Sequence, residues 1–210
     1  MPKPFPTQAR VVIIGGGVIG CSVAYHLAKL GWKDVVLLER KSLTSGTTWH
    51  AAGLIGQLRA THNMTRLAKY TADLYAGLEA ETGQATGLRE VGSLTVARDQ
   101  ERFEELKRAA AMAGCFDLDV EVISVEEAAK LWPLMRTDDL VGAVFIPKDG
   151  VTNPVDTTQA LAKGAKMGGI QFFENTKVTA VYQEKGRVTG VGTDQGDIAC
   201  EYVVNCAGLW

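Results

Sequence analysis

The chain opens on an apolar run at Val11–Ile14, which is typical of a buried parallel strand. Residues 18–30 then carry small apolar side chains at spacings of three and four, which predicts a helix that ends at Gly31. A second apolar run at Val35–Leu38 predicts another strand, and Glu39 follows it. Together these stretches predict one βαβ unit of the usual size, about 30 residues.

The remaining pattern alternates between helical and extended stretches. Residues 42–56 are rich in Ser, Thr and Gly and predict a loop. Ser124–Glu127 matches a capping box, and Glu184–Gly186 predicts a hairpin turn. Helices are predicted over 64–82, 100–113, 126–131 and 154–167, and strands over 92–98, 141–146, 171–173, 176–183, 187–193 and 202–205. The sequence ends directly after the last strand, so we expect it to be part of a longer protein.

A glycine motif, Gly15-x-Gly17-x-x-Gly20, lies between the first strand and the first helix. Gly15 permits a tight turn, Gly17 lets a pyrophosphate approach the backbone, and Gly20 lets the helix pack closely. The helix N-terminus would present free N–H groups and a partial positive charge to the phosphates. Glu39 lies 19 residues after Gly20, where its carboxylate can accept hydrogen bonds from ribose hydroxyls. Since the same acid disfavours the 2′-phosphate of NADP, another dinucleotide is predicted.

The end of the sequence favours FAD over NAD. Two strands joined by a turn precede Glu201–Gly208, which resembles the distal FAD-contacting segment of flavoproteins with two dinucleotide-binding folds. The small residues Ala207 and Gly208 let the backbone pass close to a cofactor. A short NAD-dependent dehydrogenase would continue with further βαβ units instead. FAD is therefore the predicted cofactor.

Composition narrows the function classes. Of the 210 residues, 46% are hydrophobic and 22% are charged, and a net charge of −2 favours neither nucleic acid nor an anionic membrane as a partner. No apolar run approaches the roughly 20 residues of a membrane span, and no cluster has the spacing of metal ligands. Four cysteines without a CxxC pair are typical of free thiols in a reducing compartment. Because the leader before Val11 is too short for a targeting signal, we expect a cytoplasmic protein.

The stretch Ser45–Leu54 makes a family resemblance specific. From Val11 to Trp210 the sequence resembles the dimethylglycine/sarcosine dehydrogenase branch of the D-amino-acid-oxidase-like flavoproteins. Further matching stretches are Leu78–Gly83, Gly92–Leu94, Asp149–Gly150 and Val203–Gly208. The resemblance implies an α/β fold, with a Rossmann-like FAD-binding (two-dinucleotide-fold) domain and part of an inserted α+β substrate domain. The FAD-binding segments would be residues 1–88 and 151–210, and the substrate-domain segment would be residues 89–150.

The resemblance also implies which residues contact FAD. His50 matches the histidine that family members join covalently to the 8α-methyl carbon of the flavin. Val18 and Ile19 would meet the pyrophosphate, Glu39 and Arg40 would flank the adenosine ribose, and Val178 would meet the adenine. The rest of the cofactor would run beside Gly46, Thr47, Thr48, Trp49, His50, Ala51, Ala52, Gly53 and Leu54. For His50 the alternative is a loop histidine that only hydrogen-bonds phosphate or flavin, and at the other positions the alternative is ordinary packing.

The reaction implied by the resemblance is oxidative demethylation of an N-methylated glycine, with hydride transfer from the N-methyl carbon to flavin N5. Sarcosine and dimethylglycine are the expected substrates, and Gln57–Arg59 slightly favours sarcosine. The electron acceptor stays open among an electron-transfer flavoprotein, a quinone and oxygen. Tetrahydrofolate would bind only in a C-terminal region outside this sequence. The substrate-binding residues and the general base are also expected there, so none is assigned.

Two other functions stay open. A regulatory subunit of pyruvate dehydrogenase phosphatase resembles the same region and is not an enzyme, but it lacks histidine at the position of His50. An FAD-dependent amino-acid oxidase without covalent flavin would keep the glycine motif and would not need that histidine. His50 therefore favours the demethylating enzyme. His26 and His62 are interpreted as packing or surface residues.

Overall fold

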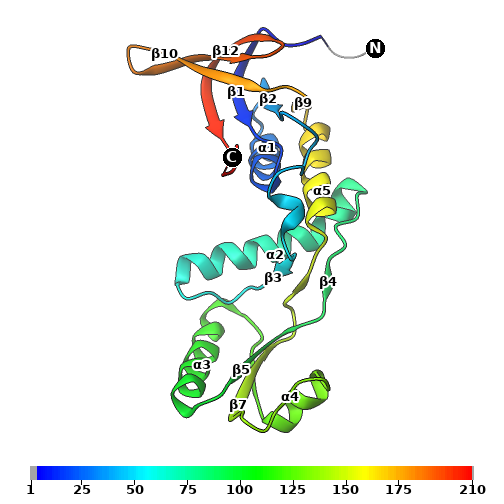
Figure 1. Cartoon of the computed structure of the whole chain (residues 1–210), viewed down its shortest axis with the longest axis vertical. Helices are drawn as coiled ribbons and strands as arrows, with labels where there is room; N and C mark the ends of the chain where they lie inside the picture. Colours follow the sequence, from blue (N-terminus) through cyan, green and yellow to red (C-terminus); the bar gives the residue numbers. More distant parts are fainter. Residues whose placement is uncertain (1–3, 210) are drawn as a thin grey trace. The chain divides into compact units, whose positions relative to one another are not determined.

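The computed structural model describes residues 4–209 (Figure 1). Residues 1–3 and Trp210, at the ends of the expected segments, lie outside the described residues. The helices are α1 (Val18–Lys29), α2 (His62–Thr82), α3 (Gln100–Ala113), α4 (Val125–Leu131) and α5 (Pro154–Met167), with 3-10 turns η1 (Thr48–His50) and η2 (Gly114–Phe116). The strands are β1 (Gln8–Ile14), β2 (Val35–Leu38), β3 (Leu54–Ile55), β4 (Arg89–Glu90), β5 (Ser93–Ala97), β6 (Glu121–Ile123), β7 (Gly142–Ile146), β8 (Gly150–Val151), β9 (Gln171–Phe173), β10 (Val178–Glu184), β11 (Arg187–Thr193) and β12 (Gly196–Asn205).

Contacts divide the chain into two compact units. The first unit holds the residues up to Ala52, Gly77–Gly87 and the chain from Asn153 onward, and the second unit holds Gly53–Ala76 and Leu88–Thr152. Residues 53–76, expected in the first FAD-binding segment, therefore group with the second unit. The FAD-binding and substrate-binding roles of the three expected segments stay predictions.

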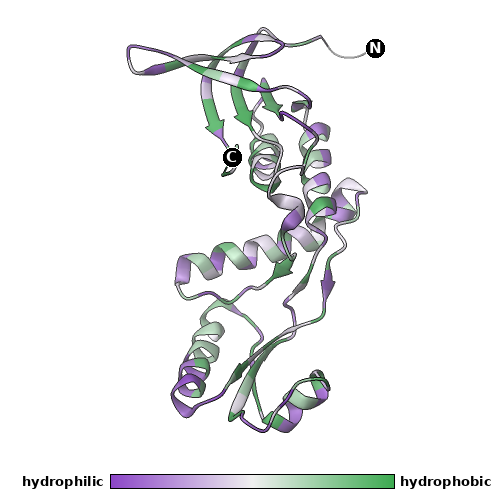
Figure 2. Ribbon diagram, viewed as in Figure 1, coloured by the Kyte–Doolittle hydropathy of each residue, from purple (hydrophilic) through white to green (hydrophobic). Residues whose placement is uncertain are grey.

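The first unit is built on a six-stranded sheet in the order β10-β11-β12-β1-β2-β9. β1 pairs in parallel with β2 and β12, and β9 pairs in parallel with β2. The antiparallel hairpin β10–β11 forms the other edge. Figure 2 shows hydrophobic residues on β1 and β2, where Val12, Val36 and Leu38 pack with Val191 and Ile198 in a buried core. The predicted parallel strands, first helix and hairpin are confirmed.

Helices α1 and α5 pack together in the first unit. Glycines of α5 permit the close approach: a Cβ added to Gly168 would lie 2.6 Å from the Cβ of Ala28, and one added to Gly164 would lie 2.8 Å from the Tyr25 ring. Asn153 caps α5 by accepting hydrogen bonds from two first-turn amides. The predicted bounds of α5 are therefore set by a cap at one end and by Gly168 at the other.

Two strands of the first unit are longer than the pattern predicts. β12 begins at Gly196 rather than at residue 202, and β1 begins at Gln8, before the predicted apolar run. The added part of β12 alternates, with Ile198 and Cys200 buried between exposed neighbours. The two extensions pair with each other in the sheet. A search for continuous apolar runs misses such residues because only one face of the extension is buried.

The second unit contains two three-stranded sheets, β3-β8-β4 and β5-β7-β6. Leu106 of α3 packs with Ala97, Val144 and Ile146 over the second sheet. The capping box at Ser124 is confirmed at the start of α4. The pattern does not predict β3, β4, β6 and β8, because strands of two or three residues form no periodicity and depend on their pairing partners. The expected loop over 42–56 accordingly contains η1 and β3.

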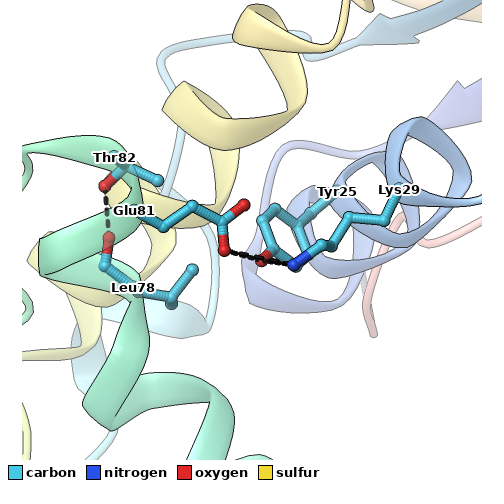
Figure 3. Close-up of polar contacts among 5 residues, drawn as sticks. All are labelled: Tyr25, Lys29, Leu78, Glu81 and Thr82. Carbon is cyan, nitrogen blue, oxygen red and sulfur yellow. Dashed lines mark hydrogen bonds and ion pairs between the residues drawn. The ribbon is translucent and has the colours of Figure 1, made fainter.

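The last turn of α2 is joined to α1 by a cluster of polar contacts in the first unit (Figure 3). The Tyr25 hydroxyl donates a hydrogen bond to Glu81 Oε2 at 2.7 Å, and Lys29 Nζ lies 3.2 Å from the same oxygen. The Thr82 hydroxyl donates to the Leu78 carbonyl at 2.7 Å. Hydrogen bonds from Tyr25 and Lys29 favour the ionised carboxylate and lower the pKa of Glu81 below its ordinary value.

Replacing Glu81 with Gln should lower the free energy of unfolding at pH 7 by about 0.5–1 kcal/mol, a charge-assisted hydrogen bond discounted for solvent screening. Because the folded pKa of Glu81 is lowered, its contribution is present above the unfolded pKa and is lost as pH falls through the folded pKa. The difference between Glu81→Gln and the unchanged chain should therefore shrink at acidic pH in urea titrations. Glu79→Gln, an exposed position on the same turn, is the control. Equal effects of both variants would contradict this assignment.

Candidate cofactor site

The turn between β1 and α1 has no room for side chains at two of its glycines. Gly15 has φ +110°, and a Cβ there would lie 2.3 Å from the carbonyl oxygen of Cys206. A Cβ on Gly20 would lie 1.9 Å from the carbonyl oxygen of Gly15. The roles that the motif predicts for Gly15 and Gly20, a tight turn and close packing, are confirmed. The carboxyl end of β12 is thereby brought against the start of α1 (Figure 1).

Glu39 is held at this turn by backbone amides. Its Oε2 accepts a hydrogen bond from the N–H of Gly16 at 2.7 Å, and its Oε1 accepts one from the N–H of Lys41 at 2.8 Å. A Cβ on Gly16 would lie 2.5 Å from the end of the Leu43 side chain and 2.9 Å from the Glu39 Cβ, so a larger residue here would have to displace both side chains. A carboxylate has about four acceptor sites, so Glu39 keeps capacity for ribose hydroxyls.

The loop after β2 is fixed to the same turn. The Thr44 N–H donates to the Gly16 carbonyl at 3.0 Å, and the Leu43 N–H donates to Glu174 Oε2 at 2.8 Å. Farther along, the Thr48 hydroxyl accepts a hydrogen bond from the N–H of Val18 at 3.0 Å. Because that oxygen accepts from the helix, the hydroxyl proton of Thr48 is available to another acceptor.

These segments enclose a groove of about 320 Å³ in the first unit. It is lined by Gly15, Gly17, Val18, Ile19, Glu39, Arg40, Lys41, Ser45, Gly46, Thr47, Thr48, Ala51, Cys206, Ala207 and Gly208. No acidic residue lies in the first turn of α1, and Gly17 caps the helix without a side chain. The positive end of the helix dipole therefore faces a space that a phosphate can enter. The groove fits a dinucleotide pyrophosphate.

The remaining predicted residues lie outside that groove. Gly20 is buried under the turn, and Val178 lines an adjoining hollow of about 220 Å³ together with Glu39, Arg40 and Ala207. Trp49, His50 and Ala52 are exposed residues of the same unit, and Gly53 and Leu54 belong to the second unit. Sequence reasoning missed seven residues that line the groove or the hollow: Ile14, Leu38, Lys41, Ser45, Thr176, Lys177 and Cys206. The contacts of all these residues with FAD stay predictions.

His50 lies at the end of η1, next in sequence to the groove residues Thr48 and Ala51. Its backbone N–H donates to the Thr47 carbonyl at 3.1 Å, which fixes the turn. Its imidazole lies against the Trp49 ring, with 3.8 Å between ring centroids. Within residues 4–209, no hydrogen bond engages the ring nitrogens of His50. His50 is an exposed residue whose imidazole contacts the Trp49 ring.

Two thiols near the groove are unreactive. Burial raises the pKa of Cys21 to about 12, and its Sγ lies 3.7 Å from the Gly16 carbonyl oxygen. Burial also raises the pKa of Cys206. Both residues are therefore thiols rather than nucleophilic thiolates at neutral pH.

Two other kinds of feature are absent from the residues that the structure describes. Between residues 4 and 209, no group of three His, Cys, Asp or Glu side chains is placed to hold a metal ion. None of the described helices has the length and apolar character needed to cross a membrane.

Comparison with known proteins identifies the dinucleotide that the family binds. A family model described as "FAD dependent oxidoreductase" matches residues 10–210. This chain belongs to that family. FAD is therefore its cofactor class, as the C-terminal segment predicted, and the resemblance to the amine-oxidising flavoproteins is confirmed.

Similar proteins include an enzyme and a regulatory protein. The chain is 45% identical over 205 residues to the mitochondrial pyruvate dehydrogenase phosphatase regulatory subunit of Mus musculus, covering 98% of this chain and 23% of the relative. It is 44% identical over 214 residues to the mitochondrial sarcosine dehydrogenase of Homo sapiens, covering 99% of this chain and 23% of that protein. The chain thus spans about a quarter of the length of these relatives.

A solved structure confirms the predicted α/β fold. L-proline dehydrogenase from P. horikoshii superposes with a TM-score of 0.91 at 30% sequence identity, covering 98% of this chain and 54% of that chain. The likeness covers both units, so the FAD-binding fold with an inserted α+β part is the architecture of this chain.

Replacing Gly20 with Ala should lower the free energy of unfolding by about 1–3 kcal/mol, because the new methyl group would overlap the Gly15 carbonyl. Gly77→Ala is the matched control, because Gly77 also lies in a helix and a Cβ there meets nothing within 4 Å. It should raise stability by up to about 1 kcal/mol through helix propensity. Urea unfolding of both variants measures the free energy of unfolding, which should fall for Gly20→Ala and rise for Gly77→Ala. A Gly20→Ala chain that is more stable than the unchanged chain would contradict the close contact.

Proposed function

We propose that this chain takes part in the FAD-dependent oxidative demethylation of an N-methylated glycine, with the flavin joined covalently to His50. The observation that carries the proposal is the exposed imidazole of His50, next in sequence to the groove residue Ala51. A neutral imidazole is a nucleophile near pH 7. The sarcosine dehydrogenase of Homo sapiens, 44% identical, supports the substrate class.

FAD would be held by the groups that line the groove. The N-terminus of α1, with the side chain of Thr48, would bind the pyrophosphate, and Glu39 would accept from the adenosine ribose. The hollow beside Val178 would receive the adenine. Since Gly15, Gly16 and Glu39 are fixed by the fold, this part of the site needs no rearrangement before binding.

When bound, FAD supplies the two-electron acceptor that takes a hydride from the N-methyl carbon. The oxidised substrate would be an iminium, whose hydrolysis gives formaldehyde and the demethylated amine; alternatively, its carbon would pass to tetrahydrofolate in a region outside this chain. The chain's own contribution is to orient the cofactor and, through η1, to limit the motion of the flavin end. The electrons would then pass to an electron-transfer flavoprotein, a quinone or oxygen. Sarcosine and dimethylglycine are the proposed substrates.

A non-catalytic regulatory role is the second candidate. The observation that favours it is the 45% identity to the pyruvate dehydrogenase phosphatase regulatory subunit of Mus musculus. Such a protein would use the same glycine turn and groove, but it would not need a reactive imidazole. The presence of His50 therefore favours the enzyme over the regulatory role.

We also propose that the protein works in a reducing compartment, with the cytoplasm as the expected one. Cys21, Cys115, Cys200 and Cys206 are all free thiols, and Cys115 is exposed. An exposed thiol persists where glutathione and thioredoxin keep cysteines reduced. The two curated relatives are described as mitochondrial, so fractionation of cells would distinguish these compartments.

Replacing His50 with Ala in the full-length protein should release the flavin on acid precipitation, while the unchanged protein keeps flavin fluorescence on the denatured polypeptide. His62→Ala is the matched control, because His62 is an exposed histidine whose ring lies against Phe116 at 4.8 Å between centroids. That variant should keep its flavin attached.

Each alternative has a distinct outcome in the same experiment. Complete release of flavin from the unchanged protein would contradict the covalent link and favour an oxidase without it. Bleaching of the flavin absorbance by sarcosine or dimethylglycine supports demethylation. No bleaching by any of sarcosine, dimethylglycine and proline would favour the regulatory role.

A further inference from the structure

Trp49 is an exposed aromatic residue directly before His50 in η1. The residues around this pair differ from it, since Thr48 is buried and Ala51 lines the cofactor groove. Trp49 has 57% of its surface exposed, although an indole gains most when its large apolar area is buried. Within residues 4–209, its aromatic contact is with His50. The indole therefore contributes little to the core, and its position is explained by its neighbour.

The rings of Trp49 and His50 lie against each other. Their centroids are 3.8 Å apart, and their planes meet at 37°. A 3-10 turn has about three residues per turn, so adjacent side chains leave its axis about 120° apart. The two rings can therefore meet only when both side chains lean toward the same side of η1, which restricts each of them to few rotamers. The contact gives the exposed imidazole a defined direction.

The backbone beneath this stack is fixed independently of the rings. The Thr48 hydroxyl accepts a hydrogen bond from the N–H of Val18 at 3.0 Å, which joins η1 to the first turn of α1. The N–H of His50 donates to the Thr47 carbonyl at 3.1 Å. These bonds position the Cα atom of His50 and do not involve its ring. The orientation of the imidazole is therefore set by the contact with Trp49.

Stacking covers one face of the imidazole and leaves its edge open. The lone pair of a neutral imidazole nitrogen lies in the plane of the ring, so a contact on the face does not block the nucleophilic atom. A side chain that already points in one direction loses less conformational entropy when it reaches the position of attack. A ring held by its face is thus suited to form a bond at its edge.

We propose that Trp49 is a positioning residue that orients the imidazole of His50 for attachment to the flavin. The inference rests on the proposed function and names the side chain that prepares its covalent link. Attachment breaks one C–H bond of the 8α-methyl group and the N–H bond of the imidazole, and it forms one C–N bond. Two protons pass to water, and two electrons pass through the flavin to the electron acceptor, which is oxygen in an aerobic solution. Trp49 makes none of these bonds and acts through His50 alone.

The rate of flavin attachment tests the inference in the full-length protein, produced in riboflavin-depleted cells and then mixed with excess FAD in air. Attachment is followed as flavin fluorescence on the denatured polypeptide. Trp49→Leu should slow attachment about 3- to 10-fold, the equivalent of one aromatic pair. Trp49→Phe keeps an aromatic ring and should stay within twofold of the unchanged rate. Trp132→Leu is the matched control, because Trp132 is almost as exposed, at 56%, but belongs to the second unit.

A second measurement separates positioning from direct contact with FAD. The covalent link cannot form in His50→Ala, so the Kd of FAD can be measured in that variant from the change in flavin fluorescence. Adding Trp49→Leu to His50→Ala should leave this Kd within twofold. A larger increase would assign Trp49 to cofactor binding and overturn the positioning role. Because Trp49 is exposed, the thermal midpoint of Trp49→Leu should equal that of the unchanged protein.

The stack itself can be observed by NMR without the cofactor. In the riboflavin-depleted full-length protein with ¹³C-labelled histidine, the ring current of the indole should shift the imidazole protons of His50 upfield, and His50→Ala identifies their signals. Trp49→Leu should abolish the shift, and Trp132→Leu should keep it. The same chemical shift in Trp49→Leu and in the unchanged protein would overturn the inference.

The outcomes distinguish this inference from the proposed function. Equal attachment rates in Trp49→Leu and the unchanged protein would overturn the positioning role and leave the covalent link to His50 intact. Equal slowing in Trp49→Leu and Trp49→Phe would also overturn it, because an aromatic ring would then give no advantage. Complete release of flavin from the denatured unchanged protein would overturn the proposed link, and the positioning role with it.

Discussion

The structure depends on the close packing of backbones where β12, β1 and α1 meet. The carbonyl of Cys206 occupies the space that a side chain on Gly15 would need, and the carbonyl of Gly15 occupies the space that one on Gly20 would need. Two successive contacts of this kind leave the first turn of α1 directly beside the carboxyl end of the sheet. The groove is the space that remains above this contact, so binding and folding share the same glycines.

The loop after β2 is arranged by the same turn, through hydrogen bonds rather than through steric fit. Gly16 gives its N–H to Glu39 and its carbonyl to Thr44, so both of its backbone groups are used. Val18 then gives its N–H to Thr48, a residue of the groove. An unpaired buried backbone group is costly, which makes these bonds obligatory rather than optional. These hydrogen bonds also fix the position of the residues that follow in the chain, including His50.

The sequence predicts the parts of the fold that have local periodicity or punctuation. α1, α3 and α5 follow from apolar spacing with a glycine stop or a cap, and the motif at Gly15 identifies the turn. The start of β12 could not be predicted, because its buried residues alternate with exposed ones and only pairing with β1 makes them a strand. Similarly, β3 and β4 exist only as partners of β8.

The residues of the cofactor groove could likewise be predicted only where they belong to a local motif. Residues in the motif could be assigned roles from the spacing, whereas Lys41 and Cys206 line the groove because distant segments fold back to it. Gly16 occupies a variable position of the motif, and the space beside it is filled by the side chains of Leu43 and Glu39, which no local pattern connects to it. Val178 was suggested by the family resemblance alone, and it lines the hollow next to Glu39.

Glu39 and Asp149 show how each unit uses an acidic residue to hold a loop in place. Both carboxylates accept backbone N–H groups, from Gly16 and Lys41 in one case and from Gln57 in the other. A carboxylate that is satisfied by amides holds a loop in place, and its charge is balanced by local dipoles rather than by a cation. The positive end of the α1 dipole, next to Glu39, is then left to face an anionic group such as a phosphate.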